Sequence, residues 1–252
     1  MRRWSSVIAL CIICAGAAWG WGSLVASYAA PGQAPNGLAY FTSSYICCST
    51  ITPDTIWRLY RSNGSVASSF AAPFVEPTGI TFGNISGTGY IWVADPSADY
   101  VYRMGCGSGS VYSSFAAPGG LPIGLAFAQE GGDYILYHTD YFNKHLYRLN
   151  ANNGSVYASY LLPYTPRDLG CGGGYLWIAD TANHLIRAST TAGSAVASFQ
   201  SQQGPPFGVC YDETDDNVWV SVAAALNYIF VYETEGIGVA PASIGRVKAL
   251  FR

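Results

Sequence analysis

A short phrase recurs five times along the chain at intervals of 39 to 45 residues, and this period constrains the fold more than any other feature. Its copies are SLVASY, SVASSF, SVYSSF, SVYASY and SAVASF, which begin at Ser23, Ser65, Ser110, Ser155 and Ser194. A period of this length is typical of repeat proteins, in which each unit buries its faces against its neighbours. The repeat therefore predicts an architecture, but a repeat fold alone specifies no reaction.

Each repeat reads as four short strands. A Pro-x-Gly-apolar segment, such as residues 122–126, precedes an apolar run such as 175–180 and a third run such as 145–150, and a glycine-containing turn leads into the Ser phrase. The second runs, including IWVA at 91–94 and LWIA at 176–179, are apolar at neighbouring positions. Both faces of each sheet must therefore be covered. A ring of four-stranded sheets packed face to face achieves this, so we expect an all-β β-propeller.

One stretch carries a resemblance to a known family. The sequence ADTANHLIR at residues 179–187 resembles the NHL repeat, and weaker copies surround Asp95 and Asp140, whereas Thr50 and Val222 replace this Asp in the first and last repeats. The resemblance covers about residues 37 to 235. It implies an NHL-type β-propeller and no particular activity, because the family includes binding scaffolds and a few lyases.

The number of blades follows from closure of the ring. An open propeller leaves two sheet edges with unpaired backbone groups. The Ser23 phrase precedes the first complete repeat, so we interpret it as an outer strand that completes the last blade. This predicts five four-stranded blades over residues 21–236; a six-bladed ring would need another inner set of three strands.

The N-terminus resembles a secretory signal peptide. Residues 1–20 combine two arginines, a short apolar run and small residues at its end. We therefore expect a secreted protein, extracellular or at the cell surface, with no membrane span after signal removal; a retained anchor is the alternative. Charged residues make up only 11% of the chain and the net charge is −3, which argues against nucleic acid as a partner. The 19 tyrosines suit protein interfaces.

Candidate catalytic residues are few. His145 and His184 occupy the same repeat position, and His138 stands alone, so we predict no catalytic residue and no metal site of histidines converging from several blades. The recurrent Asp95, Asp140 and Asp180 are expected to accept backbone N–H bonds in turns.

The densest acidic segment lies between the first two strands of the last repeat. Its carboxylates make Asp212, Asp215 and Asp216 weak Ca²⁺ candidates, although a solvated hairpin turn explains them as well. No other cofactor is predicted. Three Asn-x-Ser sequons, at Asn63, Asn84 and Asn153, are possible glycosylation sites.

Five cysteines remain after the predicted signal peptide: Cys47, Cys48, Cys106, Cys171 and Cys210. Their pairing is open, with a disulfide between Cys171 and Cys210 as one possibility. The tail, residues 237–252, belongs to no repeat, and its final part, residues 244–252, alternates basic and apolar residues. We expect it to be a sorting or assembly strand, with contacts from Arg246, Lys248, Leu250, Phe251 and Arg252.

These features favour a secreted, non-enzymatic propeller that acts as an extracellular structural or protein-interaction module and self-assembles into a homo-oligomer or filament. An NHL-type lyase or hydrolase with a metal in the central channel is one alternative. A propeller that binds glycans is another. Exposure of Trp92, Tyr137, Trp177 and Trp219 around the channel would favour glycan binding, whereas we expect these rings to be buried between blades.

Overall fold

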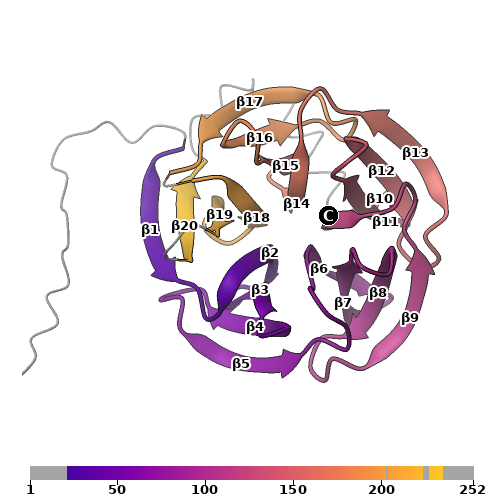
Figure 1. The fold of residues 1–252 in the computed structure, drawn as a ribbon, viewed down its shortest axis with the longest axis horizontal. Helices are drawn as coiled ribbons and strands as arrows, with labels where there is room; N and C mark the ends of the chain where they lie inside the picture. Colours follow the sequence, from indigo (N-terminus) through magenta and orange to yellow (C-terminus); the bar gives the residue numbers. More distant parts are fainter. Residues whose placement is uncertain (1–21, 203, 224–226, 235–252) are drawn as a thin grey trace, which may run out of the picture.

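The computed structural model describes residues 22–202, 204–223 and 227–234, and it shows five four-stranded antiparallel sheets around a central axis (Figure 1). The prediction of a five-bladed, all-β propeller is therefore confirmed. None of the described residues belongs to a helix that could cross a membrane. The predicted signal peptide and the predicted tail strand lie outside the described residues.

Each blade follows the four-strand order read from the repeats. Blade one contains β2 (Gln33–Thr42), β3 (Tyr45–Thr52), β4 (Thr55–Tyr60) and β5 (Val66–Ala71). Blade two contains β6 (Ile80–Ile85), β7 (Thr88–Asp95), β8 (Tyr100–Gly105) and β9 (Val111–Ala116). Blade three contains β10 (Pro122–Glu130), β11 (Asp133–Asp140), β12 (His145–Asn150) and β13 (Val156–Leu161). Blade four contains β14 (Pro166–Gly172), β15 (Tyr175–Asp180), β16 (Leu185–Ser189) and β17 (Ala195–Gln200).

Blade five is assembled from both ends of the described chain. It contains β18 (Pro206–Asp212), β19 (Asn217–Val222) and β20 (Tyr228–Glu233), and β1 (Leu24–Ala29) is its outer strand. Leu24 pairs with Tyr232, and the amide of Gly22 donates to the carbonyl of Glu233 at 2.9 Å. The prediction that the Ser23 phrase completes the last blade is thus confirmed.

Large aromatic side chains of the second strands fill the space between blades. Trp92, Tyr137, Trp177 and Trp219 are 0 to 2% exposed, as predicted. They therefore form no aromatic ring at the channel mouth of the kind that glycan binding would use. In blade one the equivalent residue is the smaller Cys47, which lines a cavity of about 50 Å³. Cys47 and Cys48 are buried core residues, in agreement with their apolar strand.

One side-chain hydroxyl bridges each junction between neighbouring blades. Each of these hydroxyls donates to a carbonyl at the start of the next blade's inner strand: Ser49 to Thr78, Thr78 to Pro122, Thr139 to Arg167, Thr181 to Pro206, and Ser221 to Asn36. Buried polar groups stabilise a fold when they are paired in this way. The five bonds fix the inner strands relative to one another, and sequence analysis missed them.

The buried His138 makes the stability of the fold depend on pH. Its ring is fully buried, and burial lowers its pKa to about 4, while Nε2 contacts the carbonyl of Pro118 at 3.2 Å. The unfolded chain binds this proton near pH 6.5, whereas the folded chain binds it only near pH 4. We expect this residue to remove about 3 kcal/mol of unfolding free energy between pH 7 and pH 4.

Urea unfolding at pH 7 and pH 4 measures this loss. The matched variant is His138→Val, because Val93 holds the same place in blade two. Between pH 7 and pH 4, the unfolding free energy of the variant should fall by about 3 kcal/mol less than that of the native protein. An equal loss in both proteins would show that the stability change comes from other groups.

Candidate functional site

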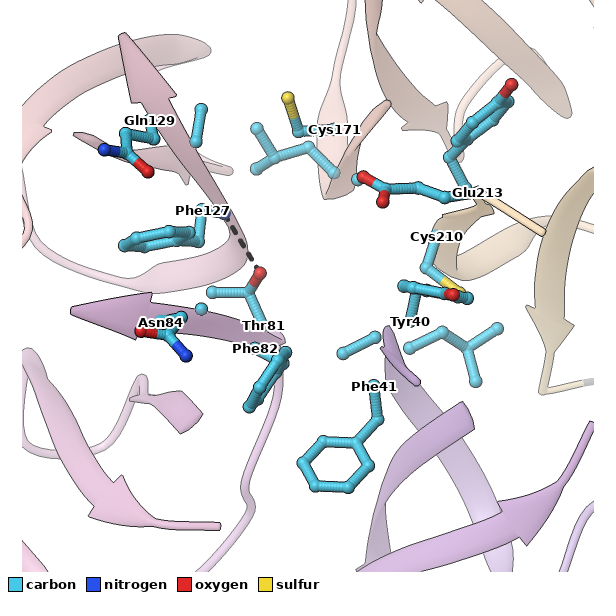
Figure 2. Close-up of a pocket in the computed structure, with 17 residues that line it drawn as sticks. Tyr40, Phe41, Thr81, Phe82, Asn84, Phe127, Gln129, Cys171, Cys210 and Glu213 are labelled. Carbon is cyan, nitrogen blue, oxygen red and sulfur yellow. Dashed lines mark hydrogen bonds between the residues drawn. The ribbon is translucent and has the colours of Figure 1, made fainter. Parts of the chain in front are cut away.

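A cavity of about 290 Å³ lies where the inner strands end, at one mouth of the central channel (Figure 2). The inner strands β2, β6, β10, β14 and β18 surround the axis (Figure 1). Each contributes its C-terminal half, so all five blades line the cavity. A concave site built from several elements is the usual place for a small ligand, and this volume lies at the lower end of the range for such pockets.

Aromatic rings form much of the cavity wall. Tyr40, Phe41, Phe82 and Phe127 all line it. Phe41 and Phe82 meet edge to face with ring centroids 4.6 Å apart, and Phe127 stacks on the buried Trp92 at 5.0 Å. The hydroxyl of Thr81 accepts the amide of Phe127 at 3.0 Å, which ties blade two to blade three (Figure 2). These contacts fix the wall before any ligand arrives.

Polar side chains at the rim come from three blades. Asn84 lies at the end of β6, Gln129 near the end of β10, and Glu213 in the turn after β18. Figure 2 shows the Glu213 carboxyl directed into the cavity, toward the side where Cys171 lies. Two neutral amides and one carboxyl therefore border a cavity whose lining combines aromatic rings with hydroxyl and thiol groups.

Among the described residues, Glu213 is the one carboxylic acid that lines the cavity. Partial desolvation and the neighbouring Asp212 carboxylate raise its pKa above the usual glutamate value, although the residue as a whole is exposed. A carboxyl whose pKa is raised is a better candidate for general acid–base catalysis than one with the usual value. Nothing in the sequence distinguishes Glu213 from the adjacent acidic residues.

Two thiols also line the cavity, but they are not activated. Burial raises the pKa of both Cys171 and Cys210 well above the usual thiol value, so neither forms a thiolate at neutral pH. Cys171 packs against the core of blade three, whereas Cys210 packs against Leu38 and Cys48. All five described cysteines are free, and the disulfide considered between Cys171 and Cys210 is not formed.

The three calcium candidates have protein partners. Arg61, in the turn between β4 and β5, binds Asp212 at 2.9 Å and also binds Asp215. Asp216 accepts a hydrogen bond from the Tyr211 hydroxyl. The Arg61 guanidinium of blade one is therefore paired with two of the three carboxylates that were considered as Ca²⁺ ligands.

The other aspartates and histidines considered from the sequence make contacts within the turns and blades. Asp95, Asp140 and Asp180 each accept a bond from a backbone amide two or three residues later, as turn residues do. His138 and His145 each stack on Tyr147 within blade three. His184 belongs to blade four, where its carbonyl accepts the amide of Ser201 at 2.8 Å.

The sequons differ in position. Asn63 and Asn153 close turns, each accepting the amide of the serine two residues later at 3.0 Å. Asn84 lines the cavity instead.

A metal in the channel does not fit the described residues. Within 22–202, 204–223 and 227–234, no three His, Cys, Asp or Glu side chains gather closely enough to hold an ion. We therefore derive no chemical step through a metal.

Comparison with known proteins identifies the fold. No protein-family model matches the chain, and no curated protein matches its sequence. Among solved structures it is similar to a glutaminyl cyclase from Myxococcus xanthus, with a TM-score of 0.65 and 11% identity over 84% of this chain and 95% of that chain. A PQQ-bound aldose sugar dehydrogenase from Streptomyces coelicolor gives a TM-score of 0.50 and 11% identity over 84% and 97%. The chain is a β-propeller.

A third similar structure is a streptogramin B lyase, with a TM-score of 0.49 and 18% identity over 84% of this chain and 72% of that chain. The glutaminyl cyclase and the sugar dehydrogenase are enzymes built on this fold, so the prediction of a non-enzymatic structural or interaction module is not supported. That prediction assumed that no titratable group served a common site, whereas Glu213 faces a cavity shared by five blades.

The PQQ of the sugar dehydrogenase does not suit this cavity. PQQ carries several carboxylates, whereas the residues that line the cavity include Glu213 and neither Lys nor Arg.

Proposed function

We propose that the protein is an enzyme whose reaction takes place in the cavity at the channel mouth, with Glu213 as the proton-transfer residue. The observation that carries this proposal is the Glu213 carboxyl, which faces an aromatic-walled cavity and has a raised pKa. Asn84 and Gln129 would bind a substrate through their amides, each offering both donors and acceptors. The cavity suits a small substrate, or the end of a longer one, that carries no net negative charge.

The likeness to a glutaminyl cyclase fold suggests the first substrates to test. Cyclisation of an N-terminal glutaminyl group joins its α-amino nitrogen to the side-chain amide carbon and releases ammonia. A proton must therefore move from the attacking amine to the leaving nitrogen, and a carboxyl with a raised pKa can transfer it. The second group to test is a panel of substrates for hydrolysis and elimination, because a lyase or hydrolase was the alternative inferred from the sequence. We also propose that the repeats are of the NHL type, on the basis of residues 179–187, and that the protein is secreted.

Blocking the rim tests whether the cavity is the reaction site. Asn84 is exposed at the rim, so Asn84→Trp should narrow the mouth without disturbing the core. The matched control is Gln200→Trp, which adds the same side chain at an exposed position of β17, away from the cavity.

The native protein and both variants are assayed on glutaminyl peptides and on the hydrolysis and elimination panel. We expect activity in the native protein and the Gln200→Trp variant and at least about a tenfold lower kcat/KM in Asn84→Trp. Full activity in Asn84→Trp would place the reaction elsewhere. No activity of the native protein on the whole panel would reject the proposed reaction classes.

A further inference from the structure

One of five equivalent inner-strand positions differs from the others. Four blades place glycine there: Gly37, Gly79, Gly124 and Gly208. A Cβ atom at any of these glycines would collide with atoms of the neighbouring blade, so the inner strands approach too closely for a side chain. Blade four alone has a side chain at this level, that of Asp168.

The Asp168 carboxylate crosses the axis. Its Oδ2 accepts the amide of Val209 in blade five at 3.0 Å and that of Leu38 in blade one at 3.3 Å. Burial raises the pKa of this carboxyl well above the usual aspartate value, while the amides of Leu125 and Leu169, in blades three and four, also interact with it and favour its charged form. A single side chain therefore interacts with backbone amides of four of the five blades.

A second contact crosses the axis beside the first. Arg167 donates from its guanidinium to Oδ1 of Asn36 in blade one at 2.8 Å, and its guanidinium lies 3.8 Å from the centre of the Phe207 ring. Asp168 and Asn36 are 1 and 2% exposed. Leu38 and Leu169, whose amides face Asp168, are also the innermost residues that line the cavity.

We propose that Asp168 closes the central channel beneath the cavity and makes it a pocket with a single mouth. The closure extends the proposed function, since a blind pocket holds a substrate beside Glu213 and keeps water from entering through the opposite face. Asp168 touches no reacting atom and acts as a positioning residue. The closure itself depends only on the packing at the axis.

Hydrogen exchange at the amides of Leu38 and Val209 tests the closure without any substrate. In the native protein the amides of Leu38 and Val209 should both exchange slowly. The amide of Ala94, which donates to the carbonyl of Gly79 at 2.9 Å, should also exchange slowly and serves as the reference. In Asp168→Gly, which restores the residue of the other blades, we expect both to exchange at least about tenfold faster while the amide of Ala94 is unchanged. Asp168→Asn keeps an acceptor and nearly the same volume, so it should stay within about threefold of native.

Three results would overturn the proposal. The first is fast exchange of the Leu38 and Val209 amides in the native protein, a measurement that needs no variant to fold. The second is native-like protection of both amides in Asp168→Gly, and the third is equal loss of protection in the Asn and Gly variants. Because these readouts use no substrate, a native protein without activity on the whole panel would reject the proposed reaction classes and leave the closure standing.

Discussion

Glu213→Gln is expected to lower kcat by about 10²- to 10⁴-fold, the usual contribution of a positioned general acid or base. Glutamine keeps the size of the side chain and its ability to form hydrogen bonds, but it exchanges no proton near neutral pH. Substrate binding through the Asn84 and Gln129 amides should persist, so KM should change much less than kcat. Steady-state kinetics on the best substrate of the panel measures both constants.

The matched control is Asp133→Asn, which removes a carboxylate from the exposed first residue of β11 and should leave kcat unchanged. If the Glu213 carboxylate acts as the base, activity should fall as pH decreases through its raised pKa, above the usual range of glutamate. Unchanged kcat in Glu213→Gln would remove this residue from the mechanism.

Trp177→Ala should lower the unfolding free energy by about 3–5 kcal/mol, as deletion of a large buried aromatic side chain does. The indole is fully buried, stacks on Tyr211 with centroids 5.9 Å apart and an angle of 8°, and donates Nε1–H to the carbonyl of Gly172 at 3.1 Å. The variant loses this contact between blades four and five and leaves a cavity there. Chemical denaturation at neutral pH measures the difference.

Two further variants separate the loss of the buried ring from the loss of the hydrogen bond and from the effect of deleting an exposed aromatic ring. Trp177→Phe keeps a ring in the space but loses the bond to Gly172, so its loss should be smaller than that of Trp177→Ala. Tyr112→Ala removes an aromatic ring that is 63% exposed and should change the unfolding free energy by no more than about 0.5 kcal/mol. An effect of Trp177→Ala as small as that of Tyr112→Ala would show that the blade interface does not depend on the indole.

The fold was predictable because its determinants are local and repeated. Runs such as residues 91–94 and 176–179 are apolar on both faces, and a sheet with two covered faces leaves few architectures. The additional Ser23 phrase identified the strand that closes the ring, since it has no other sheet to join. Both arguments use only properties that short segments carry by themselves.

The candidate site was not predictable in the same way, because its residues come together only when the ring closes. Glu213 stands beside Asp212, Asp215 and Asp216 in the sequence, and the run was interpreted as a hairpin turn with weak Ca²⁺ binding as the alternative. In the structure these neighbours separate: Arg61 binds two of them, and Glu213 alone lines the cavity. A single sequence gives no distance between blades, so it could not distinguish these roles.

Asp168 is an intermediate case. Aligning the five repeats shows one aspartate against four glycines, and this difference was available from the sequence. The role of this aspartate could be recognised only from the structure, because its carboxylate reaches amides in blades one and five that are 130 and 41 residues away in the sequence. An exception to a repeat pattern is therefore a useful marker of a particular role, although the repeat alone does not define that role.

Closure of blade five by β1 has a consequence for the order of folding. Blades one to four each consist of four consecutive strands, so each can form from a local segment of the chain. The pairing of Leu24 with Tyr232 instead joins the two ends of the described ring, and the entropy of closing so long a loop must be overcome before its contacts form. Contacts between distant residues slow folding, so we expect this seam to form last. During synthesis from the N-terminus, β1 has no partner until β20 has been made, and the nascent chain carries an unpaired strand through most of its production.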